Sequence, residues 1–461
     1  MAQQRAESPR QSADPAALPT WEDIGIVDLN AQGEGVGRHE GQVIFIPFTI
    51  PGEITDIQVT LKRPSFAKGA MTNLRLPSPT RVEPACRHFG LCGGCQYQHM
   101  AYPSQADIAA TSVVGNMRKL MKGWELPEPE ILPSPNGYGY RTQARLQFRK
   151  TPDGRLELGY TALDGQVFQV HECPILHPAL QELLAAVLRW LPEEGTQAQL
   201  RALDMRFLTL QCNADGSQRG LLFHTFELLN LKKSMDLDAW GGWWLRFGEE
   251  VPGLVGMVVD NGQVDQGFGQ NFTEEPGALA PVVPLGAFKQ NNPWIEEALY
   301  QKTLEWLAPR PGETGFDGYC GRGELTCRLV QRLAGAGHVT GVEADPVWFD
   351  KGLHVNLEFI DPILVPRIRF IQHTVEQWLA AETPRFDWAI FNPPRKGMEA
   401  GALSWIADHH RGRWVYISCN PATFARDCQG LADRYTLDRL AIADMFPQTA
   451  KMELLALFTP R

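Results

Sequence analysis

The chain has 461 residues, of which 44% are hydrophobic and 21% are charged. This length allows two to four domains with a sizeable core. The sequence contains no long uninterrupted apolar run, which argues against a membrane span. Residues 1–20 are polar and lack the apolar segment of a signal peptide, so we expect a disordered tail there.

The charge is unevenly distributed along the chain. A formal net charge of −10 does not by itself suggest a nucleic-acid-binding protein. Residues 54–150, however, contain 13 Lys/Arg and 6 Asp/Glu, so this block is basic within an acidic chain. Such a block predicts an anion-binding surface, and the alternative is a solvated basic face without a ligand.

Residues 21–82 have the pattern of a small β-barrel. Short runs of alternating apolar residues are separated by a glycine-rich turn and a Pro-Gly turn. Lys62 and Arg63 follow the last of these runs, and a barrel with a basic rim suits contact with an RNA backbone. The alternative is a structural barrel whose charged edge only keeps it soluble.

Cysteines cluster directly after this segment. Cys86, Cys92 and Cys95 lie within ten residues, and Cys173, followed by a proline, offers a fourth thiolate. Four cysteine ligands fit either zinc or an iron–sulfur cluster, and their spacing does not separate the two. The chain has nine cysteines, an odd number, and no export signal, so we expect reduced thiols and a cytoplasmic protein.

The middle of the chain, residues 83–285, predicts an α+β domain. Residues 103–124 have helical periodicity, and this helix could pack on the following domain. Arg141, Arg145 and Arg149 then alternate with apolar residues, which predicts a strand with one cationic face.

Residues 286–461 alternate strands and helices, as a parallel sheet requires. Gly321 and Gly323 stand in a loop between a strand and a helix, and Glu343 ends the next strand, where a carboxylate can bind a ribose diol. The loop lacks the third glycine of the dinucleotide fingerprint, which favours S-adenosylmethionine over NAD. Asn392-Pro-Pro-Arg395 follows a later strand.

A further strand leads into Ser418-Cys419-Asn420-Pro421. A cysteine held on the turn after a strand can serve as a nucleophile at the ligand-binding edge of the sheet, and Glu453 lies nearby in sequence. The alternative is a buried structural thiol.

Together these motifs resemble the family of RNA 5-methyluridine methyltransferases, and most closely the bacterial 23S rRNA enzymes that carry a TRAM domain and a [4Fe–4S] cluster. The resemblance runs from Trp21 through nearly the whole remaining chain. It implies an OB-like TRAM barrel in residues 21–82, a central iron–sulfur and RNA-binding domain in 83–285, and a Rossmann-like methyltransferase domain in 286–461. It also implies RNA as the partner and S-adenosylmethionine as the cofactor. We expect a monomer that binds no membrane.

The resemblance implies roles for individual residues. Cys419 matches the nucleophile and Glu453 the general base. The cluster ligands are Cys86, Cys92, Cys95 and Cys173. The cofactor-binding residues are Gln290, Tyr319, Gly321, Gly323, Glu324, Glu343, Thr374 and Asn392. The candidate RNA contacts are Lys62, Arg63, Arg141, Arg145, Arg149 and Arg395.

The sequence departs from the family pattern at three of its positions. Asn392 replaces an Asp, Lys451 stands where the family usually has His, and Glu324 occupies a common Asn position. Asn392 removes a negative charge and keeps hydrogen-bonding capacity, so we expect altered cofactor affinity and retained activity.

The implied reaction follows from the weak nucleophilicity of uracil C5. Addition of the Cys419 thiolate at C6 makes C5 electron-rich, and Glu453 removes the C5 proton after methylation. The base must leave its stack to reach the thiolate. We expect the charge of Arg395 to lower the pKa of this thiol.

Three alternative functions fit parts of the sequence. A transfer RNA 5-methyluridine methyltransferase would share Cys419 and Glu453. An amino-group methyltransferase would use the Asn392-Pro-Pro loop and would need neither residue. A non-catalytic RNA-binding relative would fit the departures at Asn392 and Lys451.

Overall fold

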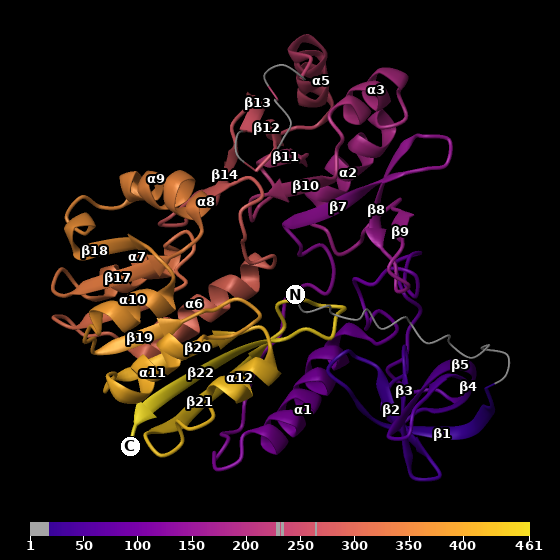
Figure 1. Ribbon diagram of the computed structural model, residues 1–461, viewed down its shortest axis with the longest axis horizontal. Helices are drawn as coiled ribbons and strands as arrows, with labels where there is room; N and C mark the ends of the chain where they lie inside the picture. Colours follow the sequence, from indigo (N-terminus) through magenta and orange to yellow (C-terminus); the bar gives the residue numbers. More distant parts are fainter. Residues whose placement is uncertain (1–17, 227–230, 232–234, 263–264) are drawn as a thin grey trace, which may run out of the picture.

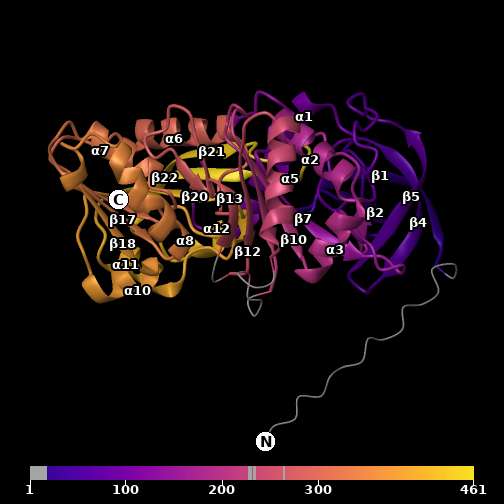
Figure 2. The same ribbon diagram turned by 90° about the horizontal axis from the view of Figure 1, so that it is seen from above.

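The computed structural model describes residues 18–226, 231, 235–262 and 265–461 (Figure 1). The first 17 residues of the expected tail therefore lie outside the described part. A barrel and a large C-terminal sheet lie at opposite ends of the molecule, with a middle sheet between them (Figure 2). No helix within the described ranges is long and apolar enough to cross a membrane.

The N-terminal segment forms a closed five-stranded barrel with the order β1-β2-β3-β5-β4, which confirms the expected OB-like fold. Alternate residues of each strand point inward, so Ile24, Ile44 and Ile57 are buried together in its core. The strands are β1 (Thr20–Leu29), β2 (Gly35–His39), β3 (Gln42–Ile46), β4 (Ile54–Lys62) and β5 (Phe66–Leu76).

The middle sheet has seven strands in the order β13-β12-β11-β10-β7-β8-β9. Leu146, Leu208 and Phe223 project from one face and pack with the apolar sides of α2, α3 and α5. The strands are β7 (Gln143–Lys150), β8 (Leu156–Thr161), β9 (Val167–Gln169), β10 (Phe207–Cys212), β11 (Arg219–His224), β12 (Leu254–Asp260) and β13 (Asp265–Gly269). The helices are α2 (Pro178–Trp190), α3 (Glu194–Ala202) and α5 (Leu237–Glu250). A short ribbon of β14 (Phe272–Glu274) and β15 (Val282–Pro284) follows.

The C-terminal sheet has the order β18-β17-β16-β19-β20-β22-β21-β6 and carries helices on both faces. Strands β16 to β20 run parallel, and β22 inserts antiparallel between β20 and β21. This arrangement confirms the expected Rossmann-like α/β fold. The strands are β16 (Thr314–Gly318), β17 (His338–Glu343), β18 (Ile368–Gln372), β19 (Trp388–Phe391), β20 (Arg413–Ser418), β21 (Tyr435–Ala443) and β22 (Glu453–Pro460).

Helices α6 and α7 pack on one face of this sheet, and α10, α11 and α12 pack on the other. These helices are α6 (Pro293–Leu307), α7 (Glu324–Arg332), α10 (Val375–Glu382), α11 (Ala400–Asp408) and α12 (Pro421–Asp427). Between β17 and β18 the chain forms only short turns of helix, α8 (Pro346–Trp348), η2 (Phe349–Leu353), α9 (His354–Asn356), η3 (Leu357–Phe359) and η4 (Val365–Arg367).

A segment from the first third of the chain completes the C-terminal sheet. Helix α1 (Tyr102–Leu120) packs beside α12, and the Trp124 indole N–H donates a hydrogen bond of 3.2 Å to the carbonyl of Cys428. Strand β6 (Glu130–Leu132) pairs in parallel with β21 at the edge of the sheet. The structural unit around this sheet therefore extends beyond residues 286–461, and the division of the chain at residue 286 stays a prediction.

Candidate active site

The loop of residues 319–323 lies where the strand order of the C-terminal sheet reverses, because β17 and β19 flank β16 on its two sides. Open α/β sheets bind ligands at such a point. Gly323 has a φ of 81° at the N-cap of α7, and a Cβ there would lie 2.6 Å from the ring of Phe370. Tyr319 also has a positive φ, 64°, a conformation that is concentrated at functional sites.

Glu343, the last residue of β17, holds this loop in place. Its carboxylate accepts the backbone N–H of Gly321 at 2.9 Å and that of Asp345 at 2.8 Å. Burial raises the pKa of Glu343. A carboxylate has about four lone-pair positions, so acceptor capacity remains for a hydroxyl group of a ligand.

Further expected cofactor residues lie at neighbouring strand ends. Asn392 directly follows β19, and its N–H donates to the carbonyl of Gly318 at 3.3 Å. Thr374 is the exposed N-cap residue of α10, after β18. The Tyr319 hydroxyl donates to Glu376, which lies in the first turn of that helix. Gln290 is half-buried just before α6.

Glu324 is engaged in structural contacts. One carboxylate oxygen accepts the N–H of Ala280 at 2.7 Å, and the other pairs with Arg328 one helical turn away at 2.6 Å. The side chain is buried. Glu324 therefore fixes the segment before β15 against α7, and a direct role in cofactor binding stays a prediction.

Cys419 and Glu453 face each other across two antiparallel strands. Ser418 of β20 pairs with Leu454 of β22, so the next step along the register places Cys419 opposite Glu453. The thiol is half-buried and Glu453 is only 2% exposed. Both residues lie at the same edge of the sheet as the loop of residues 319–323, because this edge holds the ends of the parallel strands.

Burial controls the protonation of this pair. Burial, and then the nearby carboxylate of Glu453, raise the pKa of the Cys419 thiol, while Arg395 lowers it. The expected effect of Arg395 is confirmed in direction, because its charge lowers the pKa of this thiol, but burial and Glu453 outweigh it and the net pKa is raised. Burial also raises the pKa of Glu453 to about 8, against the opposing effect of Arg395.

The raised pKa of Glu453 predicts a pH-dependent gain in stability for Glu453→Gln. The folded-state pKa of about 8 lies above the unfolded value of 4.5, so the folded state binds the proton more tightly. The contribution of the Glu453 carboxyl to the free energy of unfolding is fully present below pH 4.5 and is lost as the pH rises towards 8. We expect Glu453→Gln to match the wild type at pH 4.5 and to be more stable at pH 9 by on the order of 4 kcal/mol.

Urea unfolding between pH 4.5 and 9 measures this difference. Glu358→Gln, at an exposed position, is the matched control and should leave the pH profile unchanged. Parallel profiles for the wild type and Glu453→Gln would show that Glu453 is not buried as a neutral acid.

The loop between β21 and β22 is anchored on the cysteine segment. The carbonyl of Gln448 accepts the backbone N–H groups of Gln96 and Tyr97, both at 2.9 Å. The Gln105 side chain, from α1, donates to the Gln448 side chain and accepts the Gln448 backbone N–H, again at 2.9 Å. The residues beside Cys95 thereby fix the loop that leads into Glu453.

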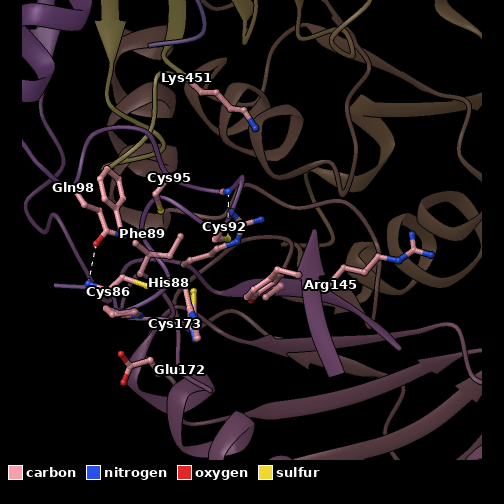
Figure 3. Close-up of a pocket in the computed structure, with 16 residues that line it drawn as sticks. Cys86, His88, Phe89, Cys92, Cys95, Gln98, Arg145, Glu172, Cys173 and Lys451 are labelled. Carbon is pink, nitrogen blue, oxygen red and sulfur yellow. Dashed lines mark hydrogen bonds between the residues drawn. The ribbon is translucent and has the colours of Figure 1, made fainter. Parts of the chain in front are cut away.

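The four expected cluster cysteines line one cavity of about 240 Å³ (Figure 3). They are Cys86, Cys92, Cys95 and Cys173, all with free thiols. Burial raises the pKa of all four, to about 11 for Cys95, and the charge of Arg141 opposes this rise for all except Cys86. Among the described residues, no group of three or more His, Cys, Asp or Glu side chains is arranged to hold a metal ion.

Lys451 lies between this cavity and Cys419. It lines the cavity, and desolvation together with the charges of Arg395 and Arg141 lowers its pKa, against the effects of Cys419 and Cys95. The catalytic pair and the cysteine cavity are therefore neighbours.

The structure brings three of the six expected RNA-contacting residues together. The charge of Arg395 lowers the pKa of Cys419, and Arg141 and Arg145 line the cysteine cavity. The other three lie elsewhere. Arg149 pairs with Glu157, Lys62 lies over the Trp21 ring of the barrel at 5.2 Å, and Arg63 is exposed at the end of β4.

Comparison with known proteins places the chain among RNA methyltransferases. The TRAM domain model matches residues 22–72, and the tRNA (Uracil-5-)-methyltransferase model matches residues 380–460. The 23S rRNA (uracil(1939)-C(5))-methyltransferase of Yersinia enterocolitica is 30% identical over 443 residues, which cover 94% of each chain. The chain belongs to the family of these 23S rRNA (uracil-C5)-methyltransferases.

A second relative and a solved structure also match nearly the whole chain. The corresponding Shewanella enzyme (strain MR-7) is 30% identical over 469 residues and covers 96% of each chain. The crystal structure of a Pyrococcus abyssi tRNA (uracil-54, C5)-methyltransferase in complex with S-adenosyl-L-homocysteine matches with a TM-score of 0.67. That match covers 95% of this chain and 99% of the archaeal one at 22% identity, which supports the fold.

Two features of the structure could not be predicted from the sequence. The anchoring of the Gln448 loop depends on contacts between segments more than 300 residues apart. On the middle sheet, Arg206 lies over the ring of Phe226 at 3.9 Å and Arg145 over that of Phe207 at 4.0 Å. Neither pair forms a motif, because the partners come from different strands or from the ends of strands.

Proposed function

We propose that this protein methylates C5 of uridine in RNA with S-adenosylmethionine, and that its substrate is 23S rRNA. The observation that carries the proposal is the placement of Cys419 opposite Glu453 at the ligand-binding edge of the sheet. A thiol and a buried carboxyl at facing positions of neighbouring strands suit addition to C6 and proton removal from C5. The relatives named for 23S rRNA support the choice of substrate.

The loop after β16 is suited to bind the cofactor. Glu343 has acceptor positions left for the ribose hydroxyl groups, and Gly321, Gly323 and Asn392 line the reversal point of the sheet. S-adenosylmethionine supplies an electrophilic methyl group when it is bound there.

The chain's own groups perform the remaining chemistry. The Cys419 thiolate forms a bond to C6 of the flipped uracil, and the electron pair displaced from the C5–C6 double bond makes C5 nucleophilic. After C5 has been methylated, Glu453 takes the C5 proton, the C5–C6 double bond forms again and the thiolate leaves. Glu453 takes this proton in its deprotonated form, which the charge of Arg395 favours against the effect of burial.

We also propose that Cys86, Cys92, Cys95 and Cys173 hold a [4Fe–4S] cluster. All four thiols face one cavity, and Arg141 favours the thiolate form of three of them. Four thiolates are a donor set that suits either zinc or an iron–sulfur cluster. The resemblance to 23S rRNA enzymes that carry a cluster is what favours iron–sulfur here. Its role would be to shape the segment that anchors the Gln448 loop.

We expect anaerobically purified protein to contain iron and inorganic sulfide, and Cys173→Ser to lose most of both, because a missing ligand exposes one iron. Metal analysis and electron paramagnetic resonance of the reduced protein measure this without an activity assay. Cys212→Ser, which removes a buried thiol of the same region outside the cavity, is the control and should keep its iron. Stoichiometric zinc in fully active protein would refute the cluster.

Product analysis tests the proposed reaction. The purified protein is incubated with S-adenosylmethionine and 23S rRNA from a strain that lacks the gene, and the RNA is digested to nucleosides. We expect 5-methyluridine. An N-methylated base would favour the amino-group reaction at Asn392, methylation of transfer RNA alone would change the substrate, and absence of S-adenosylmethionine binding would favour a non-catalytic RNA-binding protein.

A further inference from the structure

A second cavity, of about 500 Å³, opens on the face of the middle sheet opposite the helices. Arg145 and Gln147 of β7 project to this face, because the intervening Leu146 belongs to the core beneath α2, α3 and α5. The register places Phe207 opposite Gln147 and His224 opposite Phe207, so these side chains lie in one row. We call this cavity the sheet cleft.

Two arginine–aromatic pairs form the walls of the sheet cleft. The guanidinium of Arg145 lies 4.0 Å from the ring centroid of Phe207, and that of Arg206 lies 3.9 Å from the centroid of Phe226. The Phe226 side chain is 43% exposed, so part of its ring is accessible to a ligand. Flat cationic and aromatic surfaces that line a cleft are the surfaces on which unpaired nucleobases stack.

Polar groups of the sheet cleft can contact the edge of a base. The His224 ring forms a hydrogen bond of 2.9 Å with the Thr209 hydroxyl, and its other nitrogen lies 4.0 Å from Asp260. Asp260 accepts the N–H of Gly262 with one oxygen, which leaves acceptor positions for an amino group of a base. The two arginines supply the complementary charge for a phosphate.

The sheet cleft adjoins the cavity lined by the four cysteines. Arg145 lines both the cleft and the cysteine cavity, and Lys451 lines the cysteine cavity on the side of Cys419. Figure 3 shows the guanidinium of Arg145 directed away from the cysteines. A basic path therefore runs from Arg395 at the catalytic pair past Lys451 and Arg141 to the cleft.

We propose that the sheet cleft binds an unpaired nucleotide of the RNA substrate that flanks the target uridine. Its base stacks on Phe207 and Phe226, its phosphate contacts Arg145 or Arg206, and Asp260 accepts a hydrogen bond from an amino group of the base. The inference rests on the proposed function for the identity of the RNA. It adds a base-recognition site in a part of the chain that takes no part in the chemistry.

Phe226→Ala and Arg206→Gln test this site with 23S rRNA from a strain that lacks the gene. We expect Phe226→Ala to raise KM for the RNA about 10-fold, because one stacked base is lost, and to leave kcat within about twofold of the wild type. We expect Arg206→Gln to reduce the slope of log affinity against log salt by about 0.7, the value for one contact to a single-stranded phosphate. Ultraviolet cross-linking and mass spectrometry should attach a nucleotide to the peptide that contains Phe207 or Phe226.

The matched controls change the same residue types elsewhere on the surface. Phe359→Ala removes a phenyl ring that is 52% exposed in the C-terminal part, and Arg189→Gln removes an exposed charge on α2, on the helix-covered side. Both should behave as the wild type. Circular dichroism and S-adenosylmethionine affinity verify that each variant is folded.

The two proposals fail in distinguishable ways. If the wild type produces 5-methyluridine and Phe226→Ala and Arg206→Gln match their controls, the sheet cleft does not bind RNA. A fall in kcat at unchanged KM would also refute a binding role. If the wild type produces no methylated nucleoside but Phe226→Ala weakens RNA binding, the cleft is supported and the proposed reaction is wrong.

Discussion

Cys419→Ala is expected to abolish methylation, with a loss on the order of 10⁴-fold or more, the scale seen when a covalent nucleophile is removed. Without the thiolate no bond to C6 forms, and C5 stays too weak a nucleophile to take a methyl group. The variant should still bind S-adenosylmethionine, because the loop after β16 and Glu343 are untouched. Incorporation of radiolabelled methyl groups into 23S rRNA measures the loss.

Cys428→Ala is the matched control for this substitution. It removes a thiol that is fully buried at the C-cap of α12, nine residues farther along the chain. Its turnover should stay close to that of the wild type. Turnover by Cys419→Ala would show that the reaction does not proceed through a covalent adduct and would favour N-methylation at the Asn392 loop.

Glu453→Gln is expected to stop the reaction at a later step. The amide keeps the shape of the side chain and leaves Cys419 in place, but it cannot accept the C5 proton. The methylated RNA should therefore stay bonded to Cys419. A denaturing gel should show a slowly migrating protein–RNA species that forms only when S-adenosylmethionine is present, while release of 5-methyluridine falls by about 10² to 10⁴-fold.

The double variant Cys419→Ala/Glu453→Gln should show no such species, because it lacks the nucleophile. Turnover of Glu453→Gln at the wild-type rate would remove Glu453 from the mechanism. Asp444 would then be the next candidate, since burial raises its pKa to about 6 and it begins the loop that leads into Glu453. Its carboxylate, however, accepts the Tyr102 hydroxyl at 2.9 Å, which ties it to α1.

The features that could be predicted from the sequence are those encoded by neighbouring residues. The turn after β20 carries Cys419, and the loop after β16 carries Gly321 and Gly323, so strand, turn and helix signals within a dozen residues placed both. The five-stranded barrel and the parallel sheet followed from the same local periodicities. The role of Glu453 came from resemblance, and only the register of β20 and β22 supplied a physical reason for it.

The features that could not be predicted depend on residues far apart in the chain. The pKa of Cys419 is set by burial and by Glu453, and the sequence suggested only the opposing charge of Arg395. The partners of Glu324 include the backbone of Ala280, for which no pattern exists. The sheet cleft is lined by residues from the ends of four strands, and its aromatic residues are isolated in the sequence, so they form no motif.

The contribution of α1 and β6 to the C-terminal sheet has a consequence for synthesis on the ribosome. Trp124 emerges 304 residues before Cys428, the residue that its indole contacts. The apolar side of α1 can therefore pack only after α12 has been synthesised, and β6 can pair only after β21 has been synthesised. The last part of the protein thus folds through slow, long-range pairing. A nascent chain would complete its barrel well before Cys419 and Glu453 exist, and it could hold RNA before it can modify it.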